Sequence, residues 1–190
     1  MKEIIQMIVV LSLISGVCAL ALSGFRAATA ERIEDQVLQN VQGPKVKLVL
    51  DKAENDIIND RKTISVNGED VLLFVGKKGT ETWAIAYESK GGGFGGDIKV
   101  MVGYDIGNDT LTGIQVISHK ETPGIGSKIA EDQFTKSFKG LTTSTRFTTK
   151  PQGGDVDAIS GATYSARGVC EAIRNSVEIY PQVKKQMQAQ

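Results

Sequence analysis

The sequence predicts an α+β fold in which helices flank an antiparallel sheet, preceded by one N-terminal transmembrane helix. No charged residue interrupts residues 4–25. Short β-type apolar runs follow one another through residues 63–117, and their connections are too short for crossover helices, which favours antiparallel pairing. From Ala166 onward, apolar residues recur at helical spacing. A chain of 190 residues is long enough for one such domain and its anchor.

The uncharged segment at residues 4–25 is long enough to cross a bilayer. A cleaved signal peptide is the alternative, because Ala28-Thr29-Ala30 resembles a cleavage site, but such peptides have a shorter apolar core. Lys2 on one side and Arg26 on the other leave the orientation poorly determined by charge. Because the apolar stretch is long, we expect residues 1–25 to be a tail and uncleaved anchor in the cell (inner) membrane. Since only a short tail precedes the anchor, the N-terminus would be cytoplasmic and the domain extracytoplasmic.

A juxtamembrane helix is expected at residues 26–42, because apolar residues line one side of it. Gly43-Pro44 is expected to end that helix. Residues 43–190 then form the predicted compact domain. Its first elements are expected to be a short strand at residues 46–50 and a small helix at residues 53–59.

The predicted sheet is a meander of short strands. Asn67-Gly68 lies between apolar runs at residues 63–66 and 71–75, and this dipeptide is the strongest two-residue hairpin signal. Ser127 is expected to cap a helix that ends near Phe138, before an exposed polar loop. The remaining strands are expected at residues 83–87, 98–104 and 111–117, and the polar loop at residues 142–154.

The composition excludes several classes of function. Basic and acidic residues number 22 each, so the net charge is zero and gives no reason to expect nucleic-acid binding. Cys18 and Cys170 fall in two separate apolar stretches, so we expect packing residues rather than a disulfide. His119 is the only histidine, and no cysteine pair has ligand spacing, so no metal site is expected. Redox chemistry would need an organic cofactor or a partner's cluster.

The run Asp157-Ala-Ile-Ser-Gly-Ala-Thr163 is the most informative motif. It leads into the helix whose apolar stripe is Ala166, Val169, Cys170, Ile173 and Val177. Thr163 therefore lies at or just before a helix N-terminus, where unpaired N–H groups favour a phosphate. An ordinary capped helix is the alternative, because Ser160, Thr163 and Ser165 are all competent N-caps.

A second motif, Gly91-Gly-Gly-Phe-Gly-Gly96, contains the spacing G-x-G-x-x-G. A dinucleotide fingerprint must open a helix, whereas residues 97–102 are strand-like, so the Rossmann interpretation is rejected. A flexible connection between strands and a close approach of backbone to a ligand both remain open.

The third motif is His119-Lys-Glu-Thr-Pro-Gly-Ile-Gly126. Pro123 restricts the residue before it to extended conformations, and the two glycines allow a tight reversal, so a shaped loop is expected. Such loops at strand ends commonly hold ligands. No nucleophile accompanies His119, so no catalytic residue is assigned, and an autonomous hydrolase is not expected.

In their order along the chain, residues 91–96, 119–126 and 157–163, the three motifs resemble those of the FMN-binding domain family, in which a flavin transferase esterifies the last threonine with the phosphate of FMN. The resemblance implies a covalent FMN phosphoester at Thr163 and transferase recognition of Asp157. The glycine-aromatic turn would form one wall of the flavin pocket, and the third motif, with Ile125 where leucine is commoner, would surround the ring. The implied cofactor-binding residues are Gly93, Phe94, Gly95, His119, Glu121, Thr122, Pro123, Gly124, Ile125, Ser160, Gly161, Ala162, Thr163, Tyr164 and Ser165.

Over its whole length the chain resembles the G-subunit family of Rnf complexes, membrane ferredoxin:NAD oxidoreductases coupled to Na⁺ or H⁺ translocation. The resemblance implies an electron-transfer protein whose partners are the membrane, the other subunits of the complex and a flavin transferase. The C subunit of the sodium-translocating NADH:quinone reductase is the nearest alternative. A non-catalytic membrane-anchored FMN-binding module and a structural assembly subunit also remain open.

Overall fold

The computed structural model describes residues 2–188, and the chain divides into two units, Met1–Asn40 and Val41–Gln190. The first unit consists mainly of one helix, α1 (Lys2–Val37). Its stretch Lys2–Ala30 is long and apolar enough to cross a membrane, with a mean hydropathy of 2.5 and no burial inside the protein. Because α1 is continuous, the predicted anchor and most of the predicted juxtamembrane helix form a single helix. A π-helix, η1 (Leu38–Gln42), follows it.

The strand predicted at residues 46–50 is wrong, because this segment is helical. The helix α2 (Gly43–Val49) has Pro44 in its first turn, where the fixed φ of proline suits a helix and its missing N–H costs no hydrogen bond. Val46 and Val49 are both buried, three residues apart, which is a helical spacing. The Gly-Pro pair therefore starts a helix instead of ending one.

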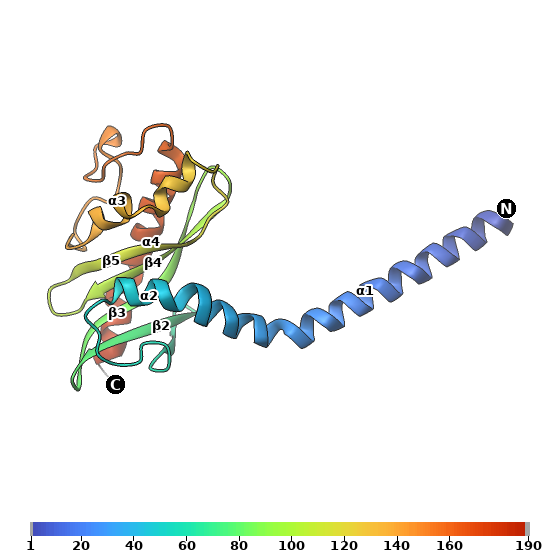
Figure 1. The fold of residues 1–190 in the computed structure, drawn as a ribbon, viewed down its shortest axis with the longest axis horizontal. Helices are drawn as coiled ribbons and strands as arrows, with labels where there is room; N and C mark the ends of the chain where they lie inside the picture. The colour runs from blue at the N-terminus through green and yellow to red at the C-terminus, as the bar shows by residue number, and fades with distance from the viewer. Residues whose placement is uncertain (1, 189–190) are drawn as a thin grey trace. The chain divides into compact units, whose positions relative to one another are not determined.

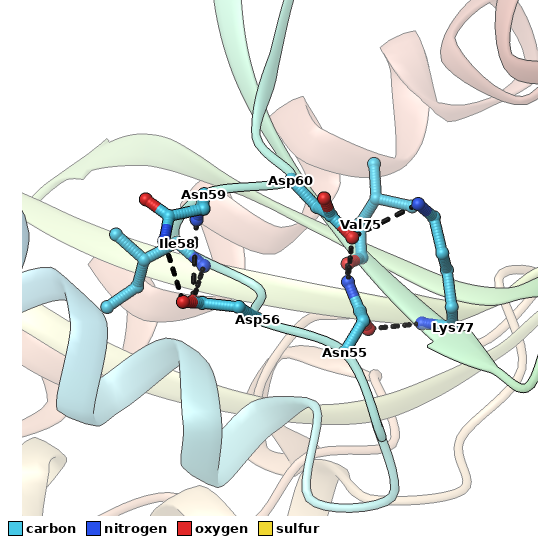
Figure 2. A network of polar contacts seen from close by, with 7 residues as sticks. All are labelled: Asn55, Asp56, Ile58, Asn59, Asp60, Val75 and Lys77. Atoms are coloured by element: carbon cyan, nitrogen blue, oxygen red, sulfur yellow. Dashed lines mark hydrogen bonds and ion pairs between the residues drawn. The ribbon is translucent and has the colours of Figure 1, made fainter.

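The small helix expected at residues 53–59 is also absent, and turns occupy this segment. The carboxylate of Asp56 accepts hydrogen bonds from the backbone N–H groups of Ile58 (3.2 Å) and Asn59 (3.5 Å), as Figure 2 shows. Such a side chain offers the backbone an alternative to helical hydrogen bonds. The amide of Asn55 ties the turn to the sheet by donating to the carbonyl of Val75 (2.9 Å).

The predicted antiparallel meander is confirmed: five strands pair in chain order. Asn67 (φ 54°) and Gly68 (φ 85°) both have positive φ, as a type I′ hairpin turn requires. All five strands extend beyond their predicted limits, since pairing with neighbours continues at the strand ends. Their bounds are β1 (Lys62–Val66), β2 (Glu69–Lys78), β3 (Glu81–Gly92), β4 (Asp97–Asp105) and β5 (Thr110–Ser118).

In place of the helix expected from Ser127 to Phe138, three short pieces occur. They are η2 (Gly126–Ala130), α3 (Asp132–Thr135) and η3 (Lys136–Phe138). Glu131 is extended (φ −74°, ψ 146°), which interrupts the helix. The hydroxyl of Ser127 is not a cap, because it accepts a hydrogen bond from the N–H of Gly124 (2.8 Å).

The loop expected at residues 142–154 is less exposed than predicted. Phe147 and Thr149 are buried, and Thr149 forms an isolated β-bridge with Val156. Arg174 of the last helix donates a hydrogen bond to the carbonyl of Phe147. The loop also contains a short 3-10 helix, η4 (Lys150–Gln152).

The last helix, α4 (Thr163–Gln188), contacts one face of the sheet, and α2 contacts the other. In Figure 1 the sheet lies between these two helices. In β4, Val100, Val102 and Tyr104 belong to the same core as the predicted stripe of α4. Gly103 points the other way, where a Cβ would overlap Val49 of α2. Cys170 belongs to the stripe, as predicted, and burial raises the pKa of its thiol to about 11.

Stacked tyrosines hold the middle of α4 against the sheet. The ring of Tyr104 lies 5.5 Å from that of Tyr87 and 4.4 Å from that of Tyr180, between ring centroids. The hydroxyls of Tyr104 and Tyr87 donate to the Oγ (2.7 Å) and the carbonyl (2.8 Å) of Ser176. Burial raises the pKa of both Tyr87 and Tyr104, so both hydroxyls stay protonated as donors.

The N-terminal part of α4 approaches β3 very closely. A Cβ on Gly91 would overlap the carbonyl oxygen of Gly168 and lie 2.6 Å from the nitrogen of Ala172. A Cβ on Gly168 would lie 2.6 Å from the carbonyl oxygen of Gly92. Glycine at these positions lets the helix backbone rest on the strand backbone, which fixes the start of α4 beside the β3–β4 turn.

Substitution Gly91→Ala should lower the free energy of unfolding by about 2 kcal/mol or more, because strand and helix backbones must separate to admit the methyl group. Gly92→Ala is the matched control, since a Cβ there would lie 3.6 Å from the nearest atom, a carboxylate oxygen of Glu171. Denaturant unfolding of the full chain in detergent measures both. Equal stability of the two variants would contradict this account of the close approach.

Candidate functional site

The turn before α4 leaves donor groups at the start of the helix. Gly161 has positive φ (77°), and the N–H of Ala162 donates to the carbonyl of Ile159 (3.0 Å). The first helical hydrogen bond runs from the N–H of Ala166 to the carbonyl of Ala162 (3.0 Å). By helix geometry, the N–H groups of residues 163–165 have no acceptor within α4. The prediction that Thr163 begins a helix is confirmed, and its side chain is exposed.

An open pocket of about 410 Å³ adjoins Thr163. All three motifs contribute to its lining, although they are far apart in the sequence. Its volume lies within the range of about 300–1,000 Å³ usual for small-molecule sites. The lining residues are Phe94, Glu121, Thr122, Ile125, Gly126, Gly161, Ala162, Thr163, Tyr164 and Ser165.

The carboxylate of Glu121 holds the three motifs together. Glu121 is only 5% exposed. One of its oxygens accepts a hydrogen bond from the N–H of Gly95 (2.8 Å) in the β3–β4 turn. The other accepts a short hydrogen bond from the hydroxyl of Ser165 in the first turn of α4. Because a buried carboxylate is costly unless it is hydrogen-bonded, both donors are needed to keep it there.

Two glycines make room for this carboxylate. A Cβ on Gly126 would lie 2.8 Å from both the Cβ of Glu121 and the Oγ of Ser165. A Cβ on Gly93 would overlap a carboxylate oxygen of Glu121 and lie 2.6 Å from the Cδ1 of Ile98. The glycine-rich turn is a tight hairpin, in which the N–H of Gly93 donates a hydrogen bond to the carbonyl of Gly96 (2.9 Å). The strand β4 follows this turn where a Rossmann fingerprint would need a helix, so the rejection of that fingerprint is confirmed.

The His119–Gly126 loop is shaped by local hydrogen bonds. The Nδ1 of half-buried His119 accepts the N–H of Glu121 (3.2 Å). The carbonyl of Thr122 accepts the N–H groups of Ile125 (3.3 Å) and Ser127 (3.1 Å), and Gly124 has positive φ (76°). His119 thus supports the backbone of the loop rather than lining the pocket.

Exposed apolar side chains form the rim of the pocket. Phe94 is 76% exposed, Tyr164 63% and Ile125 50%. The ring centroids of Phe94 and Tyr164 are 6.4 Å apart. Such side chains around an exposed hydroxyl offer an apolar surface to a flat ring.

The remaining predicted residues take supporting or separate positions. Gly93 and Gly95 belong to the hairpin turn, and exposed Pro123 and Gly124 lie at the outside of the loop. Ser160 and Asp157 line a second pocket of about 430 Å³, together with Lys128, Glu131 and Phe134. The carboxylate of Asp157 is 75% exposed and pairs with the Nζ of Lys150 at 2.6 Å. Asp157 and Thr163 therefore belong to different pockets.

Gly126 lines the pocket beside Thr163, although the sequence did not lead us to place it in the cofactor site. Its position two residues after the Pro123-Gly124 turn could have indicated this role. Among the residues that the structure describes, no group of three or more His, Cys, Asp or Glu side chains is arranged to hold a metal ion.

These features suit a flavin that carries a phosphate. The helix N–H groups are donors for phosphate oxygens, and positive-φ Gly161 keeps the approach to exposed Thr163 free of a Cβ. The apolar rim lies beside Thr163, where it can contact a flat ring. The fold and the pocket thus define a flavin-binding domain.

Comparison with known proteins supports the assignment as a flavin-binding domain. Residues 93–178 match the model of the FMN-binding domain. The G subunit of the ion-translocating oxidoreductase complex of Methanosarcina acetivorans is 32% identical, over 93% of this chain and 94% of that protein. The G subunit of the Na⁺-translocating ferredoxin:NAD⁺ oxidoreductase complex of Acetobacterium woodii is 31% identical, over 97% and 95%. The chain belongs to the G-subunit family of ion-translocating oxidoreductase complexes, and the predicted resemblance is confirmed. With its apolar α1, it is a membrane-anchored member.

Two solved structures share the fold. The C subunit of the Na⁺-translocating NADH-quinone reductase of Parabacteroides distasonis superposes with a TM-score of 0.63 at 22% identity, over 80% of this chain and 95% of that one. NqrC of Shewanella oneidensis gives a TM-score of 0.52 at 22% identity, over 73% and 72%.

Substitution Glu121→Ala should loosen the pocket, because the Gly95 N–H and the Ser165 hydroxyl lose their acceptor. We expect about 2–4 kcal/mol less stability and faster amide hydrogen exchange at Gly95. Glu121→Gln should be intermediate, since it keeps one acceptor oxygen. Glu131→Ala, at an exposed glutamate, is the control. Unchanged exchange at Gly95 in Glu121→Ala would refute the bridging role.

Proposed function

We propose that this chain is the membrane-anchored electron carrier of an Rnf-type ferredoxin:NAD oxidoreductase coupled to Na⁺ or H⁺ translocation, with FMN joined through its phosphate to Thr163. One observation supports this proposal most strongly. Thr163 is exposed at the first residue of α4, beside a pocket lined by all three motifs. Family membership supports the assignment to such a complex.

The residues of the pocket divide into three roles. The N–H groups of residues 163–165 and the positive end of α4 would hold the phosphate. Phe94, Ile125 and Tyr164 line the pocket, where they would contact the flavin ring and shield it from water on one side. Glu121 keeps these walls at a constant separation through its two hydrogen bonds.

Bound FMN supplies reversible electron transfer, which no group of this chain provides by itself. The ester bond lies at the phosphate, remote from the ring, so the tether holds the cofactor without altering the ring covalently. Tethering keeps the flavin at high effective concentration beside the rim. This suits a domain on the extracytoplasmic side of the membrane, with the N-terminus of α1 in the cytoplasm.

The attachment needs an activated phosphoryl donor, for which a flavin dinucleotide has the right chemistry. The bond from Thr163 Oγ to phosphorus forms as the anhydride P–O bond breaks. The second nucleotide leaves as its monophosphate, and the hydroxyl proton passes to solvent. A flavin transferase would catalyse this step and recognise Asp157, whose exposed carboxylate lies in the neighbouring pocket.

The C subunit of a sodium-translocating quinone reductase is the second candidate, favoured by the shared fold. Purification of the intact membrane complex separates the two. Proteins that oxidise ferredoxin would accompany the chain in the first case and a quinone-reducing assembly in the second.

Substitution Thr163→Ala should abolish covalent flavin, since the ester oxygen is removed. Intact-protein mass and in-gel flavin fluorescence after denaturation measure the adduct in membranes from cells that also express a flavin transferase. Thr80→Ala is the matched control and should keep the adduct, because Thr80 is exposed in the turn between β2 and β3 and lines neither pocket. An adduct in Thr163→Ala, or none in the unaltered chain, would refute the proposal.

Substitution Asp157→Ala should leave the protein unmodified but equally stable, because the lost side chain is exposed and serves recognition. Lys150→Ala removes the same ion pair and should be modified normally, which separates the carboxylate itself from its pairing. The extent of flavinylation by mass is the readout. Complete modification of Asp157→Ala would show that Asp157 is not needed for recognition.

A further inference from the structure

Arg167 lies where its side chain can reach an anion on Thr163. The two residues are four apart in α4, so they share one face of the helix. Helical side chains lean toward the N-terminus, which directs that of Arg167 toward Thr163. Both residues are exposed to solvent.

The ring of Tyr164 supports the guanidinium. The Cζ of Arg167 lies 5.4 Å from the centroid of this ring, a cation–π arrangement. Tyr164 itself lies beside Phe94 at the rim of the pocket. The guanidinium thus lies over the ring of a residue that lines the pocket.

Among the residues that the structure describes, none of the ion pairs involves the guanidinium of Arg167. Glu171, one turn further along α4, is engaged by the N–H of Gly92 (3.1 Å). Arg174 on the same helix behaves differently, because it binds the Phe147 carbonyl and the Thr148 hydroxyl.

A guanidinium suits a phosphate diester, because its planar N–H groups bind two phosphate oxygens at once. Such a diester keeps one negative charge, which the helix N-terminus alone neutralises only in part. We propose that Arg167 is the phosphate-binding side chain of this site, a role that rests on the proposed ester at Thr163. It supplements the N–H groups of residues 163–165.

The test compares Arg167→Gln and Arg167→Lys with the unaltered full chain, each co-expressed with a flavin transferase. Initial flavinylation should fall at least about tenfold in Arg167→Gln and less in Arg167→Lys, because charge-assisted hydrogen bonds are lost. The ³¹P resonance of the attached diester should shift in Arg167→Lys and in any modified Arg167→Gln. Arg146→Gln, at a second exposed arginine, should change neither readout. Thermal unfolding should be the same in all variants.

Equal flavinylation of Arg167→Gln and the unaltered chain would overturn the role of Arg167. So would slower flavinylation with an unchanged ³¹P resonance in Arg167→Lys, because the arginine would then serve the transferase and not the phosphate. Failure of the ester itself is distinguishable, since the unaltered chain would then carry no adduct and show no diester resonance.

Discussion

The buried carboxylate of Glu121 is the interaction on which the site depends. It joins Gly95 and Ser165, which lie 26 residues before it and 44 after it. Loss of the carboxylate would leave the Gly95 N–H and the Ser165 hydroxyl without this shared acceptor at the pocket. The glycines at 93 and 126 fit the same constraint, because a side chain at either position would displace Glu121 or its partners. A buried, hydrogen-bonded carboxylate thus specifies how two loops and the first turn of α4 meet.

The rest of the domain makes this junction rigid. Gly91 and Gly168 bring strand and helix backbones into contact near the start of α4, and the stack of Tyr87, Tyr104 and Tyr180 holds the same helix further along. A helix supported at two places presents its first turn in a constant position. For the tethered cofactor that we propose this matters, since a tether limits distance but only the pocket walls set orientation.

The sequence predicted best where the signal is local. Asn67-Gly68 specifies its hairpin through φ alone, and the apolar stripe of α4 is visible in its spacing. Prediction failed where two local signals compete. Gly43-Pro44 was interpreted as a helix end, although proline equally suits a first turn. Ser127 was interpreted as a cap, but its hydroxyl serves the turn at Gly124.

By itself, the sequence determined the antiparallel meander, the helix start at Thr163 and the three motifs, because turns, caps and periodicity depend on neighbours along the chain. Three features were decided only by the tertiary structure. Glu121, in the third motif, hydrogen-bonds to the other two motifs. Asp157 and Ser160 line a separate pocket, and Arg167 lies over the ring of Tyr164. The first two depend on contacts between residues distant in sequence. The third depends on the conformations of two exposed side chains on the same helix, which the sequence does not specify.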